Sequence, residues 1–354
     1  MDYSWALDFL KTLEKASITT ELKKKELVTL LAADPNDSKL LFNLADRVRA
    51  QYMSNAVHLR GIIEISNYCR QNCHYCGLRC DNKKLGRYRL SYEEIYKTAE
   101  EAVNIGYKTL VLQAGEDNHY SPLEIALLIK AIKKLDVAIT LSLGEHDYET
   151  YGLWREAGAD RYLLKHETAD PVLYQKIRPG KTLEERLKCQ TWLKELGYQL
   201  GSGCMVGLPG QTLDTLAQDL LLLKKMAVEM AGIGPFIPHP DTPLAASKGG
   251  SLEMTLKMVA LARIIMPLVH LPSTTALGTI HPQGRELALQ GGANVVMPNV
   301  SPSQYRELYQ IYPNKICVKD EPEHCKSCIT GKILALGRTI GTDYGHSPKL
   351  QGGY

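Results

Sequence analysis

Three cysteines in the first third of the chain have the spacing of a metal-binding motif. Cys69, Cys73 and Cys76 lie within the eight residues CRQNCHYC. Three thiolates at this spacing can bind three irons of one iron–sulfur cluster, which four thiolates normally hold. The fourth iron would be open to another ligand and so available for chemistry. A closed zinc site is the alternative, because His74 or Cys80 could supply the fourth ligand that such a site needs.

A second cysteine group lies near the C-terminus, within CVKDEPEHCKSC. Cys317, Cys325 and Cys328 again favour an iron–sulfur cluster, auxiliary to the first. His324 would complete a Cys3His zinc site, so zinc stays an alternative here as well. We expect the remaining cysteines, which are scattered, not to bind metal: Cys80, Cys189 and Cys204.

The composition excludes several classes of protein. The chain has 354 residues and is 44% hydrophobic, which is enough for a large core. Its 42 basic and 39 acidic residues give a net charge of +3, too balanced to favour a nucleic-acid or membrane surface. We find no signal peptide and no bilayer-crossing run. A cytoplasmic protein is therefore expected, in which thiols stay reduced and clustered cysteines bind metal.

The elements that position these cysteines follow from the periodicity of apolar residues. Residues 1–58 read as a helical N-terminal extension. From residue 59 onward, short β-rich runs alternate with helical stretches, which is typical of parallel βα units. The expected helices span residues 92–105, 122–135, 149–157, 183–196, 213–226, 254–266 and 283–290. The expected strands are Leu59–Ile65, Thr109–Gln113, Val137–Leu143, Arg161–Lys165, Gln199–Val206, Gly232–Phe236, Val269–Ser273 and Asn294–Met297.

Eight such strands predict an α/β fold, a (β/α)8 TIM-type barrel over residues 59–311. A doubly wound open sheet is the alternative. In a barrel, functional residues lie at the C-terminal ends of the strands. The first cysteine group directly follows the first strand, so it occupies an active-site position. Residues 312–354 form a C-terminal segment that carries the second cysteine group.

The motif and its place after the first strand resemble the radical S-adenosylmethionine (SAM) superfamily. More narrowly, the chain is similar to the radical SAM maturases of FeFe-hydrogenases, the HydE type. Biotin synthase and methylornithine synthase are related families of the same design. The stretches that carry the resemblance are SNYCRQNCHYCGLRCDNKKLGRYRLSYEEI at 66–95, LQAGED at 112–117, KHET at 165–168 and STTALGTIHPQGRELALQGGANVVMPNVSP at 273–302.

The resemblance implies roles for individual residues. The first three cysteines bind a 4Fe–4S cluster, and SAM chelates its fourth iron through amino and carboxylate groups. Gly115 and Glu116 stand in place of a GGE motif that receives the SAM amino group, with Ala114 replacing its first glycine. Glu167 resembles an acid that binds the ribose hydroxyls, and Arg186 a base that pairs with the SAM carboxylate. Further residues near the cofactor are Tyr75, Met297, Tyr309 and the segment 207–210.

Elementary chemistry fits two of these roles. A carboxylate can accept two hydrogen bonds from a diol, and a guanidinium offers a bidentate fork to a carboxylate. The residues alone also allow plainer interpretations. Glu167 would then be a solvent-facing loop acid, and Arg186 would belong to an ordinary ion pair along its helix.

The resemblance also implies an activity. The reduced cluster passes one electron to the SAM sulfonium, and the products are methionine and a 5′-deoxyadenosyl radical. The implied task is assembly of the di-iron subcluster of the hydrogenase active site, the H-cluster. The substrate would be a small organometallic iron–cysteine species with CO and cyanide, and the partners would be other maturases and an electron donor.

An anionic substrate of this kind needs hydrogen-bond donors and positive charge inside the barrel. The candidates are Arg161 at the start of the fourth strand and three residues after the seventh: Ser273, Thr274 and Thr275. Plainer alternatives are a surface arginine, and hydroxyls that cap the following helix.

Two other functions stay open from the sequence. One is a radical SAM mutase or synthase of the methylornithine or biotin synthase type. The other is a non-catalytic iron–sulfur scaffold that carries metal. The stretches STTALG and ANVVMPNVSP favour the maturase.

Overall fold

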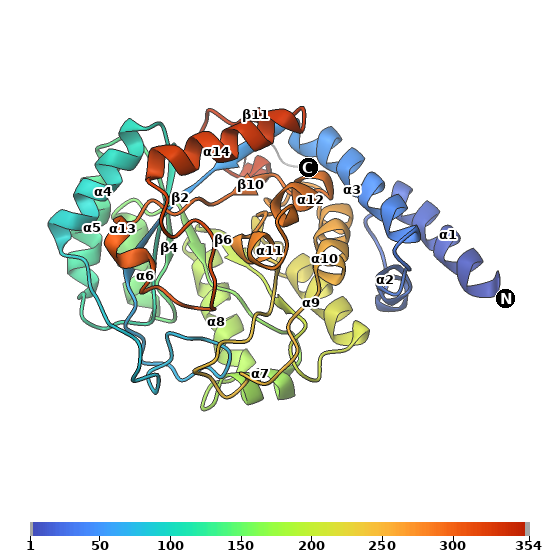
Figure 1. Cartoon of the computed structure of the whole chain (residues 1–354), viewed down its shortest axis with the longest axis horizontal. Coiled ribbons are helices and arrows are strands. Elements are labelled where there is room, and N and C mark those ends of the chain that lie inside the picture. The colour runs from blue at the N-terminus through green and yellow to red at the C-terminus, as the bar shows by residue number, and fades with distance from the viewer. Residues whose placement is uncertain (1–2, 351–354) are drawn as a thin grey trace.

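The computed structural model describes residues 3–350, with side chains from residue 6 onward. Residues 1–2 and 351–354 of the predicted terminal segments lie outside this range. Three helices precede the first strand: α1 (Tyr3–Ile18), α2 (Lys24–Leu31) and α3 (Asp37–Met53). α2 packs against α9 (Leu213–Lys225), and α3 packs along α10 (Leu252–Ile265), so this extension lies on the outside of the fold (Figure 1).

Six strands form one continuous parallel sheet at the centre of the molecule. In order they are β2 (Gly61–Ser66), β3 (Thr109–Ala114), β4 (Ala138–Ser142), β5 (Arg161–Leu163), β6 (Gln199–Ser202) and β8 (Met230–Ala231). Each pairs in parallel with the next, for example Ile63 opposite Leu112 and Leu112 opposite Leu141. Their side chains are largely buried on both faces, as expected for strands enclosed by helices.

Isolated bridges close this sheet into a ring. Met230 pairs with His270, and Pro272 pairs with Val295 of β10 (Val295–Val296). Asn299 then pairs with Ile62 of the first barrel strand. The predicted seventh and eighth strands are thus present at their expected places, one of them only as single bridges. The eight-stranded barrel is confirmed, and the open sheet is wrong.

The predicted helices are confirmed to within two residues at either end. They are α4 (Tyr92–Asn104), α5 (Pro122–Lys133), α6 (Tyr148–Glu156), α8 (Leu183–Glu195), α9, α10 and α12 (Gly284–Gln290). Capping boxes begin several of them, as where Ser91 accepts from the Glu94 amide and the Glu94 side chain accepts from the Ser91 amide. Further helices are α7 (Pro171–Ile177), α11 (Thr275–Ile280), α13 (Ser303–Arg306) and α14 (Pro322–Ala335).

Three predicted strands need correction. The fifth, predicted over Gln199–Val206, is β6 followed by a separate short strand. The run from residue 59 is two strands, because β1 (Ala56–Leu59) precedes β2 and starts inside the predicted helical extension. The sixth barrel strand is β8, two residues before the predicted start. The later residues instead form β9 (Gly234–Pro235), which pairs with β7 (Met205–Val206) beyond the barrel ring.

The C-terminal segment closes the N-terminal end of the barrel. After α14 (Figure 1), β11 (Thr339–Ile340) pairs with β1. The residues that follow lie at the N-terminal ends of the barrel strands. Arg60 donates to the Gly345 carbonyl at 3.0 Å, and Gln199 lies 2.7 Å from His346 Nδ1. The cavity of the barrel is therefore blocked at this end. The predicted boundaries at residues 59 and 311 stay predictions.

Within residues 3–350, no helix is long and apolar enough to cross a membrane.

Candidate active site

A cavity of about 360 Å³ opens at the C-terminal ends of the barrel strands. It brings together thirteen of the predicted site residues, which come from loops and strand ends all around the ring. These are Cys69, Cys73, Tyr75, Cys76, Gly115, Glu116, Glu167, Arg186, Ser273, Thr274, Thr275, Met297 and Tyr309. Residues far apart in the sequence thus form one pocket.

The first cysteine group lies in the loop between β2 and α4. The Cys69 Sγ accepts hydrogen bonds from the backbone amides of Gln71 and Glu116, both at 3.4 Å. Burial, together with the neighbouring charges of Glu116 and Cys73, raises the pKa of the Cys69 thiol to about 11 despite the two amide hydrogen bonds, which lower it. Burial also raises the pKa of Cys76, as do the charges of Cys73 and Cys69. The three thiols are therefore close together, which is the arrangement that a shared cluster needs.

Arg87 fixes the shape of this loop from behind. Its guanidinium donates to the carbonyls of Leu78 at 3.0 Å and Arg79 at 2.8 Å. Asn82 adds a bond to the Gly77 carbonyl at 2.8 Å. A loop without regular structure is thus held by side-chain donors, so its cysteines have a defined position.

Gly115 lets the end of β3 approach the cysteine loop closely. A Cβ at this position would lie 2.2 Å from the Tyr68 carbonyl oxygen and 2.7 Å from the Cys69 Cβ. Both distances are shorter than van der Waals contact allows, so only glycine fits here. The replacement of the preceding glycine by Ala114 causes no comparable crowding, because Ala114 lines the cavity.

Buried charges surround one side of the pocket. Glu116 lies 3.4 Å from Arg178, and Glu145 lies 2.9 Å from Arg186. Arg178 also approaches Glu145 at 3.7 Å, and Lys181 lies 3.1 Å from Glu145. Arg178 and Glu145 were missed from the sequence, where nothing in their spacing distinguishes them from surface charges.

Glu167 has a strained backbone. Its φ is +65°, in the left-handed region that few residues other than glycine adopt. The neighbouring strand holds it on both sides, since its amide donates to the Gly203 carbonyl at 2.9 Å and its carbonyl accepts from Met205 at 3.0 Å. Lys165 Nζ lies 3.5 Å from its carboxylate.

The loop after the seventh barrel strand contributes hydroxyl groups to the cavity, and the end of the fourth strand contributes a cation. Thr274 is the N-cap of α11 and accepts from the Leu277 amide at 3.4 Å, so the capping alternative holds for it. The Ser273 hydroxyl donates to the Arg285 carbonyl at 2.9 Å. Lys165, which the sequence analysis missed, also lines the cavity. Its place at the C-terminal end of the predicted fourth strand was the signal that could have found it.

Arg161 is not brought to this pocket. Its Nη2 donates to the Tyr344 carbonyl at 2.6 Å and lies 2.9 Å from His346 Nδ1, both in the C-terminal segment. It begins β5 and therefore lies at the closed end of the barrel. The expectation that Arg161 contacts substrate is corrected accordingly: neither a pocket residue nor a surface arginine, it holds the segment that closes the barrel.

The second cysteine group does not line the cavity. Cys325 is buried on α14, Cys328 is exposed, and Cys317 has a φ of +62° in the preceding loop. A hydrogen bond with Cys325 and, to a smaller extent, the charge of Arg285 lower the pKa of Cys317 to about 6 despite its burial. Cys317 and Cys325 are thus adjacent. Which metal this group binds stays a prediction.

The main pocket has the donors and acceptors that a cluster and SAM require. Three thiols converge on one wall, and a glycine makes room for backbone beside them. Arg178 Nε is buried and has no hydrogen-bond partner among the described residues. A buried unpaired donor is costly, so it favours binding of a ligand with acceptor oxygens. The residues present therefore fit both groups.

Comparisons with known proteins agree with this geometry. The radical SAM superfamily model matches residues 63–223. The chain is 55% identical over 338 residues to the [FeFe] hydrogenase maturase subunit HydE of Thermotoga maritima, with 96% of each chain covered. It is 32% identical to a 3-methylornithine synthase of Methanosarcina acetivorans, over 78% of this chain and 79% of that protein.

Solved structures show the same fold. The crystal structure of methylornithine synthase (PylB) matches with a TM-score of 0.83 at 27% identity, covering 93% of this chain and 97% of that one. The hydrogenase maturase HydG matches with a TM-score of 0.81 at 21% identity, covering 95% of this chain and 76% of that one. The chain therefore belongs to the radical SAM superfamily and, within it, to the HydE family of [FeFe]-hydrogenase maturases.

Proposed function

We propose that this chain cleaves SAM reductively while it builds the di-iron subcluster of the FeFe-hydrogenase H-cluster. One observation carries the proposal. Three thiols, two carboxylates and two arginines from distant parts of the chain converge on one cavity that is blocked at its far end. A radical enzyme needs such an enclosure, because water and stray hydrogen donors would quench its intermediate.

The proposed cofactor sites follow from the residues that line the cavity. Cys69, Cys73 and Cys76 would hold the 4Fe–4S cluster and leave one iron for SAM. When bound, the reduced cluster supplies one electron to SAM, which yields methionine and a 5′-deoxyadenosyl radical. The protein contributes position and charge, and it keeps water out.

Three charged residues would hold SAM. Arg186 offers its guanidinium to the carboxylate, and Glu145 orients that guanidinium from 2.9 Å. Glu116 would receive the amino group, since its contact with Arg178 at 3.4 Å is loose enough to admit another partner. Glu167 would accept from the ribose hydroxyls. The three other side chains near the cofactor are Tyr75, Met297 and Tyr309.

The substrate would lie beside the hydroxyl groups that follow the seventh barrel strand. We place the small iron–cysteine species with CO and cyanide beside Ser273, Thr274 and Thr275. We assign the cation of this site to Lys165 and not to Arg161, because Lys165 lines the cavity and Arg161 does not. An ammonium at this place would attract an anionic complex and leave its hydroxyl neighbours to orient it.

The C-terminal cysteines would hold an auxiliary iron–sulfur cluster. Cys317 and Cys325 are adjacent, which supports a shared metal. Iron, zinc and sulfide contents of a Cys73→Ala variant would test this, because only the auxiliary site then remains. Zinc without sulfide would favour the Cys3His alternative that includes His324.

The proposed partners are other maturases of the H-cluster and an electron donor to the first cluster. The name of the relative from Thermotoga maritima supports the maturation partners. All nine cysteines are free thiols, which supports a cytoplasmic protein.

The test is anaerobic reconstitution with iron and sulfide, followed by dithionite and SAM. We expect 5′-deoxyadenosine and methionine in equal amounts, and loss of both with Cys73→Ala. A cluster-loaded protein that forms no 5′-deoxyadenosine would contradict the proposal and favour a scaffold. Cleavage without support of hydrogenase activation, in a mixture with partner maturases and apo-hydrogenase, would instead favour a synthase related to methylornithine synthase.

A further inference from the structure

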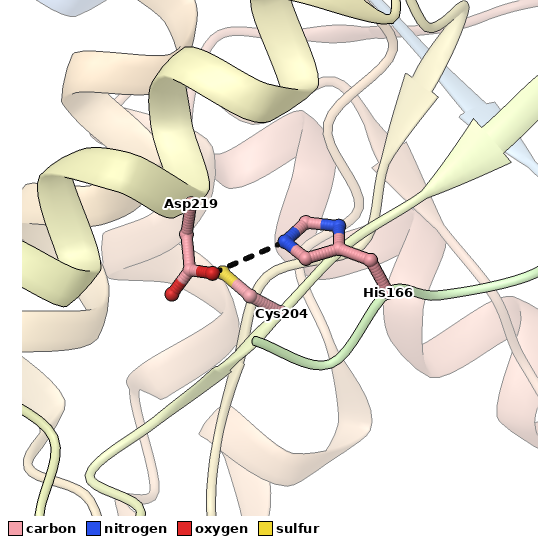
Figure 2. Close-up of side chains that lie close together, drawn as sticks. All are labelled: His166, Cys204 and Asp219. Carbon is pink, nitrogen blue, oxygen red and sulfur yellow. Dashed lines mark hydrogen bonds and ion pairs between the residues drawn. The ribbon is translucent and has the colours of Figure 1, made fainter. Parts of the chain in front are cut away.

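His166, the residue before Glu167 in the sequence, belongs to a buried polar cluster that takes no part in the pocket (Figure 2). His166 Nε2 lies 3.2 Å from Asp219 Oδ1, and His166 Nδ1 lies 3.0 Å from the Ser202 hydroxyl. The side chains of His166 and Asp219 are 1% and 0% exposed. Burying such groups costs free energy unless they are paired, so their pairing needs a reason.

The hydrogen bonds around His166 determine which ring nitrogen carries the proton. The Ser202 hydroxyl accepts from Gln190 at 2.8 Å, so its own proton is free to point at His166 Nδ1. The proton of the neutral imidazole then lies on Nε2 and is donated to Asp219. His166 is thereby held between β6 and α9.

Asp219 also binds a second residue of the turn that contains Glu167. Its Oδ1 also accepts from the Ala169 amide at 2.5 Å. One carboxylate oxygen thus binds residues on both sides of Glu167, at positions 166 and 169. Because Asp219 belongs to α9, it ties the whole turn from His166 to Ala169 to that helix.

The residue inside this turn is the strained one. A non-glycine residue with a φ of +65° is strained and persists only where its surroundings impose it. The backbone bonds of Glu167 to Gly203 and Met205 fix it from one side. The Asp219 bonds fix the flanking residues from the other side.

We propose that Asp219, through His166 and the Ala169 amide, is a positioning residue for Glu167. It holds the left-handed backbone that aims the Glu167 carboxylate into the pocket, toward the cofactor's ribose diol. The inference rests on the proposed ribose role of Glu167. It adds that this role depends on a carboxylate that touches no ligand.

A metal ion is the competing interpretation of the same cluster. Cys204 lies beside His166 and Asp219, and one ligand atom from each falls within 4.8 Å of the others. However, both imidazole nitrogens and both carboxylate oxygens already have hydrogen-bond partners. The cluster is thus satisfied without a cation, so the positioning role is favoured. Metal content enters the test as an outcome.

The experiment compares two ligands on the cluster-loaded enzyme: SAM and its 2′,3′-dideoxy analogue, which lacks the diol. Dissociation constants are measured by calorimetry for wild type and for Glu167→Gln, Asp219→Ala, Asp219→Asn and Cys204→Ala. Wild type should prefer SAM by about tenfold or more, the usual size for hydrogen bonds to a charged group. Asp219→Ala should remove most of this preference by weakening SAM and leaving the analogue unchanged.

Two variants provide matched controls. Asp219→Asn keeps an oxygen that can accept from Ala169 and His166, so it should retain most of the preference. Cys204→Ala changes the same cluster without touching these bonds and should retain all of it. Glu167→Gln combined with Asp219→Ala should be no worse than either change alone, because both act on one contact.

Each failure has a distinct meaning. If Glu167→Gln does not weaken SAM selectively, the proposed ribose role falls. If Glu167→Gln does so but folded Asp219→Ala weakens both ligands equally, or neither, the positioning role is overturned and the ribose role stands. Stoichiometric zinc in the wild type that is lost in Cys204→Ala would also overturn the positioning role. Should Asp219→Ala fail to fold, His166→Gln takes its place with the same expectation.

Discussion

Each of the two cysteine groups has three thiols, but the surroundings of the two groups differ. Cys69, Cys73 and Cys76 lie at the open end of the barrel and face the main cavity. Cys317, Cys325 and Cys328 lie around the start of α14, with the last of them exposed. In both groups the number and type of ligands suggest a cluster. Only the position relative to the barrel separates a site for chemistry from a peripheral one.

The thiols also differ in their readiness to react. Burial raises the pKa of Cys69 to about 11, so its thiol keeps its proton at neutral pH until a metal displaces it. The hydrogen bond with Cys325, with help from Arg285, lowers the pKa of Cys317 to about 6. Cys69 is therefore protected from chemistry in solution, while Cys317 is open to it.

Removing one ligand from each group gives the largest expected difference. Cys73→Ala should lower 5′-deoxyadenosine formation by at least about a thousandfold, since the cofactor supplies the chemistry. Cys325→Ala should leave formation within about twofold, because its thiol does not line the cavity. The rate is measured by mass spectrometry after anaerobic reduction. A similar loss in both variants would end the distinction between the groups.

Alkylation of the apo-protein tests the difference in thiol chemistry. At pH 7 iodoacetamide should modify Cys317 on the order of 30 times faster than Cys69, because a larger thiolate fraction outweighs the lower nucleophilicity of a weak base. The Cys317 rate should level off above about pH 7, as its pKa is about 6. The Cys69 rate should keep rising toward its pKa of about 11. Peptide mass spectrometry follows both rates, and equal rates at pH 7 would contradict the contrast.

A glycine beside each group tests how tightly each is packed. Gly115→Ala should destabilise the protein by about 1–3 kcal/mol and displace Cys69, as overpacking does. Gly331→Ala, in α14 with nothing within 4 Å of the new methyl group, should stabilise by about 0.5–1 kcal/mol. Denaturant unfolding of the apo-proteins and iron content after reconstitution measure both effects. A neutral Gly115→Ala would show that the cysteine loop is not held as described.

Most of the fold could be predicted from the alternation of strands and helices. The barrel strands are buried on both faces and separated by capped helices, so each leaves a local signal. β1 and β11 leave none, because each is short and pairs with a strand far away in sequence. The sixth strand was placed two residues late, since the run around Gly232 continues past the ring into β9.

The site could be predicted where a motif or the resemblance marked it. Arg178 and Glu145 were missed, because a single charged residue in a loop or just after a helix looks like any surface charge. Lys165 was missed although its place at the C-terminal end of a predicted strand could have marked it. Arg161 was predicted at the start of its strand, where it lies, but it was wrongly expected to reach the pocket at the other end. A strand of only three residues, Arg161–Leu163, separates the closed end of the barrel from the pocket. The position of a residue along the strand therefore determines whether it reaches the pocket, and its charge alone does not.

The central claim is that the first cysteine group leaves one iron free for SAM. It is tested most directly by electron paramagnetic resonance of the dithionite-reduced cluster in a variant that lacks the second group, with Cys317, Cys325 and Cys328 all changed to alanine. We expect one cluster for each chain and a spectrum that changes when SAM is added, because SAM occupies the open iron. A reduced cluster whose spectrum is the same with and without saturating SAM would contradict it.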